Sequence, residues 1–200
     1  MLHPLRRVGW TAPVLSLLLS LGAVACRERA WHGITMEPAS PAPSLTVAGA
    51  AEDSTTRFVL ANEVGRVVLL YFGYTHCPDV CPTTLADWAR AKRALGADTA
   101  GVRWVFISVD PTRDTPTVAR AYAAQFDRAF IGTAVSEAEL APMLKDWAIA
   151  AYPEGDPRTA DYTVAHPAHT FVVDAAGRLR LMIPPGVRGE QIADDLRRLR

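Results

Sequence analysis

The sequence has few cysteines and no surplus of charge of either sign. Only three cysteines occur among 200 residues, and 21 basic side chains balance 21 acidic ones. Without a basic excess, the composition gives no support to nucleic-acid binding. Three cysteines, one of them isolated, are too few for a disulfide-stapled scaffold. No internal repeat is visible, and half of the residues are hydrophobic, so we expect one globular domain with an appendage.

The first 25 residues have the layout of a secretory signal. Arg6 and Arg7 precede an apolar stretch from Val14 to Ala25, and no acidic residue occurs in this part of the chain. A basic start followed by an apolar run is typical of export signals. We therefore expect residues 1–25 to be a signal, and the folded part to be exported to the periplasmic or extracytoplasmic side of the membrane.

Cys26 follows this apolar run directly. Ala23 and Ala25 before it resemble a bacterial lipobox, in which the cysteine carries the lipid. The sequence thus predicts a lipoprotein signal and a membrane anchor at Cys26. An uncleaved membrane helix is the alternative, although Pro13 and several polar residues make the 18 uncharged residues from position 8 to 25 a poor spanning segment.

Residues 26–44 form the next segment. Pro38, Pro41 and Pro43 stand there among small residues, a composition typical of a tether or extended arm. Trp31 and Ile34 are its apolar exceptions and could dock the arm onto the domain. The folded domain is predicted to span residues 45–200.

Short apolar runs alternate with amphipathic segments in this domain. The run Val67–Phe72 is rich in β-branched and aromatic residues and is too short for a buried helix, so it predicts a central strand. A helix is expected from Thr83 to Leu95, ended by Gly96. The other expected elements are strands 102–109, 130–131, 169–173 and 179–183, helices 116–126, 137–150 and 189–199, and an edge hairpin of 45–47 with 57–60. This order predicts an α/β fold with a central mixed sheet flanked by helices.

Cys77 and Cys81 stand just beyond the first buried strand. Two thiols at this spacing can bind one soft metal ion such as copper(I), or oxidise to a disulfide. Pro82 is expected as the first helical residue and Cys81 as the N-cap, where the helix dipole lowers the pKa of a thiol. A dithiol at a strand end points to a thioredoxin-like domain with an N-terminal extension. Two buried structural cysteines are the alternative, and the chemistry is metal binding, redox exchange or both.

The histidines discriminate between these chemistries, because copper(I) held by two thiolates needs a third donor. His166 stands in the loop before the strand at residue 169, and in a thioredoxin-like sheet that loop faces the dithiol turn. A solvent-exposed loop histidine is an equally supported interpretation. His76, next to Cys77, is interpreted as a polar loop residue, and His169 as a surface or edge residue.

Two blocks of sequence are similar to the SCO/SenC family: Phe72–Leu85, which reads FGYTHCPDVCPTTL, and Ser108–Pro116, which reads SVDPTRDTP. The likeness covers essentially the whole chain after the signal. It implies a thioredoxin-like, membrane-tethered protein that binds copper and helps to assemble the dinuclear copper site of cytochrome c oxidase. Carried over by position, Cys77 and Cys81 match the two thiolate ligands of one copper ion. His166 matches the imidazole ligand.

The implied partners are the copper-site subunit of cytochrome c oxidase, and with it other copper chaperones or thioredoxin-like reductants. The family's usual histidine setting is Asp-His-Ser or Asp-His-Thr, whereas this chain has Ala165-His166-Pro167. The missing carboxylate removes a partner of the imidazole, and Pro167 restricts the backbone, so we expect weaker copper binding than the family's norm.

A second function is consistent with the same residues. Cys77 and Cys81 could be the redox dithiol of a thiol-disulfide oxidoreductase that reduces the cysteines of the oxidase subunit or of another exported protein. Such catalysis would not need His166, which separates the two hypotheses. A peroxide-reducing or redox-sensing thioredoxin relative is a third hypothesis that rests on fold alone.

Overall fold

The computed structural model describes residues 30–48 and 56–199. Residues 31–200 form one compact unit. The expected signal at residues 1–25 and the anchor at Cys26 lie outside the described residues. Within the described ranges, no helix has both the length and the apolar character needed to cross a membrane.

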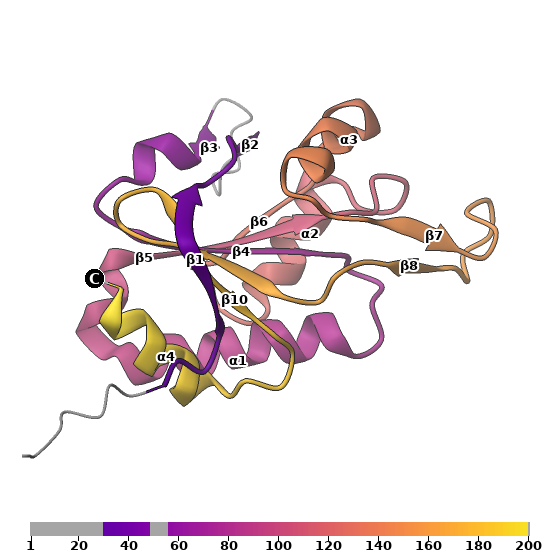
Figure 1. Ribbon diagram of the computed structural model, residues 1–200. Helices are drawn as coiled ribbons and strands as arrows, with labels where there is room; N and C mark the ends of the chain where they lie inside the picture. The colour runs from indigo at the N-terminus through magenta and orange to yellow at the C-terminus, as the bar shows by residue number, and fades with distance from the viewer. Residues whose placement is uncertain (1–29, 49–55, 200) are drawn as a thin grey trace, which may run out of the picture. The chain divides into compact units, whose positions relative to one another are not determined.

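A six-stranded mixed sheet runs through the centre of this unit (Figure 1). Its strand order is β1-β10-β9-β4-β5-β6, with β4–β5 and β5–β6 parallel and the other pairs antiparallel. The strands are β1 (Ile34–Pro41), β4 (Val67–Gly73), β5 (Val102–Ser108), β6 (Ile131–Thr133), β9 (Thr170–Val173) and β10 (Arg178–Ile183). Every residue of β4 is buried, which confirms the predicted central strand.

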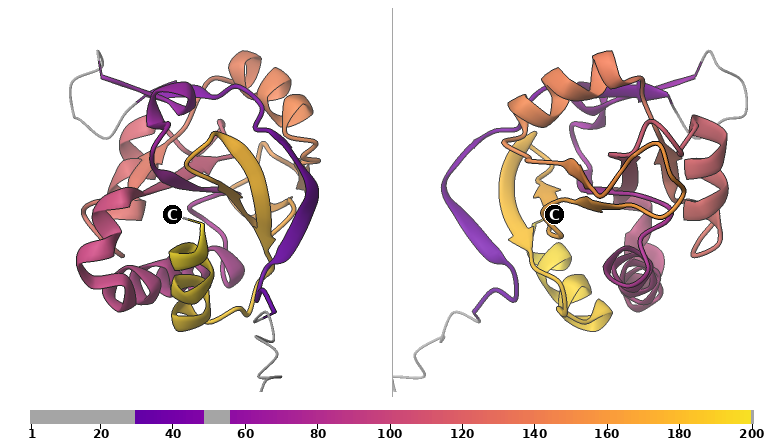
Figure 2. Two further views of the ribbon diagram at one scale, coloured as in Figure 1. Left: turned by 60° about the vertical axis from the view of Figure 1, so that its left-hand side comes forward. Right: turned by 90° about the vertical axis from the view of Figure 1, so that its right-hand side faces the viewer.

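Helices cover both faces of the sheet (Figure 2). They are α1 (Val80–Leu95), α2 (Pro116–Ala124), α3 (Glu137–Asp146) and α4 (Gly189–Arg198), with two short 3-10 turns, η1 (Leu60–Glu63) and η2 (Gly96–Gly101). On the α1 face, the ring of Trp88 lies 5.7 Å from that of Trp104 in β5. On the opposite face, Phe72 of β4 lies 5.9 Å from Trp147 at the end of α3. The predicted architecture of a mixed sheet between helices is confirmed.

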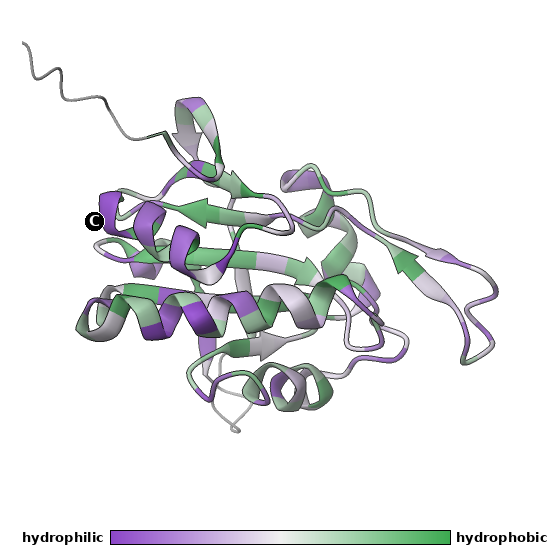
Figure 3. Cartoon of the chain, turned by 90° about the horizontal axis from the view of Figure 1, so that it is seen from below, coloured by the Kyte–Doolittle hydropathy of each residue, from purple (hydrophilic) through white to green (hydrophobic). Residues whose placement is uncertain are grey.

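Hydropathy follows these layers. Seen from below, α1 and α4 turn many hydrophilic residues outward, and the strands behind them are largely hydrophobic (Figure 3). The predicted helix ends are also present: Gly96 ends α1 with a φ of 59°, and the Thr115 side chain accepts a hydrogen bond from the Val118 amide at the start of α2. Local sequence signals thus set several element boundaries.

The expected extended arm is partly a strand. Residues 34–41 pair with β10 as the edge strand β1, and the register shifts between Thr35 and Ser40. Prolines are tolerated there because an edge strand with an interrupted ladder needs fewer backbone donors. Before β1, the buried Asp195 carboxylate of α4 accepts hydrogen bonds from the backbone amides of His32 and Gly33. The guanidinium carbon of Arg198 lies over the Trp31 ring, 3.6 Å from the ring centroid. This contact docks the segment before β1 onto α4.

Two small hairpins complete the unit. The first joins β2 (Thr46–Ala48) to β3 (Arg57–Val59), and it confirms the hairpin expected there. The second joins β7 (Tyr152–Glu154) to β8 (Thr163–Ala165) and was not predicted. All three residues of β7 are exposed, so the sequence carries no alternating apolar pattern that would reveal it. This second hairpin ends immediately before His166.

Candidate metal centre

The two cysteines lie at the junction between β4 and α1. Cys77 stands in the connecting loop, and Cys81 is the second residue of α1, whose N-cap is Asp79. The prediction that Cys81 would be the N-cap and Pro82 the first helical residue is therefore wrong by two positions. Proline is accommodated as the third helical residue because the first amides of a helix have no acceptor within the helix.

The two thiols are free and face each other across the helix start. The Cys81 amide donates to Cys77 Sγ at 3.4 Å, and the Tyr71 hydroxyl donates to Cys81 Sγ at 3.3 Å. Cys81 is fully buried, whereas Cys77 is partly exposed. Any reagent from solution therefore meets Cys77 first.

Their surroundings make the two thiols chemically unequal. A hydrogen bond from the Cys81 thiol lowers the pKa of Cys77, and His166 and the backbone amides of Asp79 and Cys81 act in the same direction, against the effect of burial. The pKa of Cys81 is raised, first by its bond to Cys77 and then by burial. Because one hydrogen bond joins the pair and the two pKa values shift in opposite directions, Cys77 loses its proton before Cys81 does.

Gly73 allows the cysteines to lie this close to the sheet. A Cβ at this position would lie 2.8 Å from Tyr71 Cε1 and 2.9 Å from Cys81 Sγ. Both distances are too short for real Cβ contacts, and both neighbours are buried. The glycine before the cysteine loop thus serves packing at the site rather than a turn.

His166 approaches the sulfurs from the end of β8. Its Nε2 lies 3.6 Å from Cys81 Sγ, and its Nδ1 lies 3.1 Å from the carbonyl oxygen of Pro167. In the tautomer that suits metal binding, the proton would be on Nδ1 and would donate to that carbonyl, which leaves the Nε2 lone pair for an ion. The rings of Tyr71 and Tyr74 flank the imidazole edge-on. The sequence predicted that the imidazole would lack a carboxylate partner. In the structure, the carbonyl oxygen of Pro167 is the hydrogen-bond partner of its Nδ1.

One ligand atom from each of Cys77, Cys81 and His166 lies within 4.8 Å of the others. Two sulfurs and one imidazole nitrogen are soft donors, and three of them suit copper(I) better than zinc, which usually takes four ligands. The donor set therefore fits a single soft ion. The ligand roles of these residues remain a prediction.

The other described histidines do not join this group. His76 is half-exposed, and its Nδ1 lies 3.1 Å from the Thr75 hydroxyl. The Nδ1 of His32 lies 3.2 Å from the Gln191 amide nitrogen. His169 lines a different cavity, on the α3 side of the sheet.

Residues of the Ser108–Pro116 segment contact both the loop that carries Cys77 and the hairpin that precedes His166. The Asp114 carboxylate accepts a hydrogen bond from the Thr75 amide at 2.9 Å and another from the Thr75 hydroxyl. These two bonds fix the cysteine loop. Arg113 donates to the Tyr162 carbonyl at 2.9 Å, and its guanidinium lies 3.5 Å from the centroid of the Tyr162 ring. The Tyr162 hydroxyl donates to Asp110, to which Arg113 is also paired. The loop after β5 therefore ties the cysteine loop to the hairpin that carries His166.

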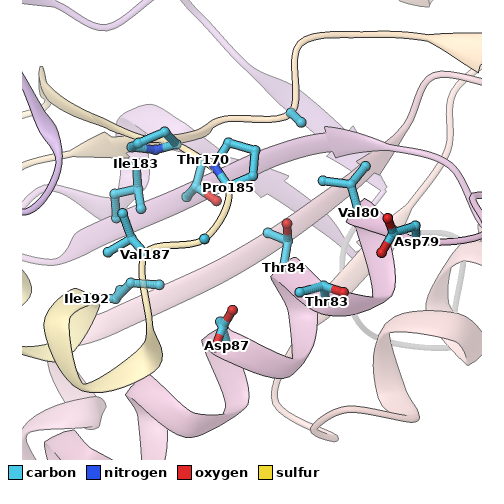
Figure 4. Close-up of a pocket in the computed structure, with 13 residues that line it drawn as sticks. Asp79, Val80, Thr83, Thr84, Asp87, Thr170, Ile183, Pro185, Val187 and Ile192 are labelled. Atoms are coloured by element: carbon cyan, nitrogen blue, oxygen red, sulfur yellow. The ribbon is translucent and has the colours of Figure 1, made fainter.

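A cavity of about 180 Å³ borders the centre (Figure 4). One wall is the start of α1, from Asp79 and Val80 to Thr83 and Thr84, and the facing wall includes Val187 in the loop after β10. The helical turn that carries Cys81 is thus shared by the metal centre and an adjoining hollow.

The SCO1/SenC family model matches residues 52–200. A SCO2-like protein from Rickettsia felis is 34% identical over 115 residues, which cover 57% of this chain and 56% of that protein. The chain thus spans little more than half the length of the curated relatives it matches.

Solved structures extend the likeness to the whole folded unit. Apo Sco1 from Thermus thermophilus aligns with a TM-score of 0.75 at 32% identity, over 87% of this chain and 99% of that one. Copper-bound ScoI from Bradyrhizobium japonicum aligns with a TM-score of 0.71 at 32% identity, over 80% of this chain and 100% of that one. A thioredoxin domain of a Bacteroides vulgatus oxidoreductase, 15% identical over 80% of this chain and 94% of that one, shares the fold alone with a TM-score of 0.54. The predicted thioredoxin-like fold is confirmed.

Proposed function

Because this chain belongs to the SCO1/SenC family, we propose that it is a copper(I)-binding assembly factor with one ion held by Cys77, Cys81 and His166. The proposal rests on one observation: three soft ligand atoms, from segments 85 positions apart, lie within 4.8 Å of one another. The Bradyrhizobium relative, which is 32% identical and has copper bound in its structure, supports the choice of metal.

The unequal exposure of the ligands suits transfer of the ion as cargo. Cys81 is buried, whereas Cys77 and His166 are partly exposed. Ligands of a recipient can therefore approach from the side of Cys77 and His166, and Cys81 keeps its position on α1. Two thiolates and an imidazole bind copper(I) strongly enough to retain it and can exchange with the thiols of a partner.

Titration with copper(I) against a competing chelator tests this proposal. We expect the reduced full-length chain to bind one copper ion at this site, and His166→Ala to weaken the affinity by about tenfold or more, since each tenfold step is about 1.4 kcal/mol. His76→Ala is the matched control, because that imidazole lies next to Cys77 without facing the sulfurs, and its affinity should stay near that of the parent. Equal affinities of the His166→Ala variant and the parent would show that the third ligand is wrong.

The recipient proposed here is the copper-site subunit of cytochrome c oxidase, and family membership is the support. We expect the copper-loaded chain to transfer its ion to the reduced copper-binding domain of that subunit. Chromatographic separation of the two proteins after mixing, followed by metal analysis, measures the transfer. Retention of all copper by this chain would contradict the assignment of the recipient.

Export and anchoring at Cys26 are also proposed, supported by the basic start, the apolar run and the small residues before this cysteine. Mass spectrometry of the mature N-terminus measures the outcome directly. A lipid-modified Cys26 is the expected result, and an intact residue 1 would favour the uncleaved helix instead.

A thiol-disulfide oxidoreductase is the second candidate, because the partly exposed Cys77 has a lowered pKa and the buried Cys81 has a raised pKa. In this reaction the Cys77 thiolate attacks a target disulfide and forms a mixed disulfide, and the other target sulfur leaves as a thiolate. Cys81 then loses its proton, attacks Cys77 Sγ and releases the second target thiolate. The target gains two electrons, and this chain ends as the Cys77–Cys81 disulfide.

Reduction of a disulfide-containing substrate protein distinguishes this activity from copper binding. We expect any reductase activity to persist in His166→Ala and to be lost in Cys77→Ser and in Cys81→Ser. Activity that disappears together with the imidazole would contradict a dithiol mechanism.

A further inference from the structure

A second set of soft donor side chains lies away from the dithiol. A cavity of about 320 Å³ on the α3 side of the sheet is lined by Met36 of β1, Met182 of β10 and His169, which immediately precedes β9. Thioether and imidazole groups are ligands that copper(I) prefers. The function proposed above uses none of the three.

The sheet register and the cavity lining place these side chains near one edge of the sheet. Met182 stands opposite Phe171 in the antiparallel pair of β9 and β10, and His169 comes two residues before Phe171. Met182 also stands opposite Ile34 of β1, and Met36 comes two residues after Ile34. Cross-strand partners share a face, so Ile34, Met182 and Phe171 lie on the same side of the sheet. Met36 follows the last regular pair before the register shift of β1, and His169 precedes β9, and both line the same cavity as Met182. Figure 2 shows β1 running beside β10 at this edge.

The surroundings of these donors favour a cation. The ring nitrogens of His169 make no hydrogen bond to any residue of the described ranges, so a lone pair is available for a ligand. Asp146 is the one charged side chain among the residues that line the cavity, and its charge is negative. The indole of Trp147 lines the cavity too, and aromatic faces attract cations.

Lining of the cavity distinguishes two of the methionines from the third. Methionine often fills irregular gaps in a core, and Met182 and Met143 are both packed against the hydrophobic core, but only Met36 and Met182 line this cavity. Met143 of α3 is packed against the hydrophobic core and does not line this cavity, which makes it the natural control.

We propose that Met36, His169 and Met182 form a second binding site for a soft monovalent metal ion, copper(I) or silver(I). The site is independent of the function proposed above, because Cys77, Cys81 and His166 take no part in it. The loop from residue 166 to 169 nevertheless carries one imidazole for each site, and Pro167 of that loop lines the cavity. An ion in this cavity would therefore lie against the segment that presents His166 to the dithiol.

Silver(I) titration of the full chain carrying Cys26→Ser, Cys77→Ser and Cys81→Ser, with 13C-labelled methionine methyl groups, tests this inference. We expect the methyl signals of Met36 and Met182 to shift and to saturate at one equivalent of silver, while the signal of Met143 stays in place. His169→Ala should weaken this binding by about tenfold or more, and so should Met36→Leu and Met182→Leu, whereas Met143→Leu should not.

The inference is overturned if the Met36 and Met182 signals do not move, or if they move no more than that of Met143. It is also overturned if His169→Ala leaves the silver affinity unchanged. If the triple serine variant does not fold, the reduced chain with Cys26→Ser alone serves instead, and there the second equivalent of silver should shift Met36 and Met182. None of these results depends on whether His166→Ala changes copper affinity, so the two proposals fail separately.

Discussion

At the scale of single residues, Cys77 and Cys81 differ in burial and in the pKa of their thiols. Both follow the same strand, yet Cys77 is partly exposed with a lowered pKa and Cys81 is buried with a raised pKa. The difference arises mainly from the hydrogen bond between the two sulfur groups. Such a pair can hold a soft ion or begin thiol-disulfide exchange, which is why both functions remain tied to the same two atoms.

The pH dependence of alkylation tests the role of Cys81 in this difference. In the reduced parent, we expect iodoacetamide to react with Cys77 at a rate that stays nearly constant as the pH falls through the ordinary cysteine pKa of about 8.5. A lowered pKa keeps the thiolate down to more acidic pH, so the rate should fall only below that range. Cys81→Ala removes the largest cause and should move the profile to higher pH, whereas the hydroxyl of Cys81→Ser can still donate.

A parent profile with its midpoint near the ordinary cysteine pKa would contradict the lowered pKa of Cys77. Identical profiles for Cys81→Ala and the parent would show that the helix start and His166, rather than Cys81, set the acidity of Cys77.

At the scale of elements, the hairpin of β7 and β8 determines where His166 stands. Its strands are three residues each, β7 is entirely exposed, and Val164 is the buried residue of β8. Arg113 and Asp110 hold it from outside through Tyr162. The position of the imidazole therefore depends on a clamp that belongs to the loop after β5.

Removal of this clamp should weaken copper binding at a distance. We expect Arg113→Ala to lower the copper(I) affinity by about tenfold, because His166 would be held less firmly while both sulfurs stay in place. Amide hydrogen exchange at residues 163–166 should become faster in the same variant. The alkylation rate of Cys77 at high pH should not change.

Arg158→Ala is the matched control, since Arg158 lies in the same hairpin and pairs with the nearby Asp156 at an exposed position. Its copper affinity and hydrogen exchange should equal those of the parent. Equal losses of copper(I) affinity in the Arg113→Ala and Arg158→Ala variants would show that the contacts of Arg113 with Tyr162 do not specifically position His166.

At the scale of the whole molecule, a bound ion would connect segments that the chain keeps apart. Cys81 at the start of α1 and His166 just after β8 are 85 positions apart in the chain. A ligand that binds only the folded state stabilises it by mass action, by about 2.7 kcal/mol at a free concentration of 100 times Kd.

Thermal unfolding should therefore report metal binding. With copper(I) buffered at about 100 times Kd, we expect Tm to rise by roughly 5–10 °C, given about 2–4 °C per kcal/mol for a chain of this size. Addition of a strong copper(I) chelator should return Tm to its initial value. The variant with Cys77→Ser and His166→Ala should show a much smaller rise, and an undiminished rise there would mean that stabilisation comes from another site.

Much of the fold could be predicted because its signals are local. The apolar run of β4, the glycine that ends α1 and the threonine cap of α2 each specify backbone conformation within a few residues. The start of α1 was misplaced because Pro82 was assumed to mark the first helical residue, although any of the first helical positions tolerates proline. The hairpin of β7 and β8 was missed because tertiary contacts, and not an apolar pattern, hold it.

The amino-acid sequence by itself determined the pair of thiols, their place after a buried strand and the family likeness, because each depends on residues that are near neighbours in the chain. Only the tertiary structure decided which thiol is buried, that the imidazole of His166 faces the sulfurs, and that its other nitrogen meets a backbone carbonyl. These features depend on segments 85 positions apart, and only the packing of the hairpin against the loop after β5 sets that distance.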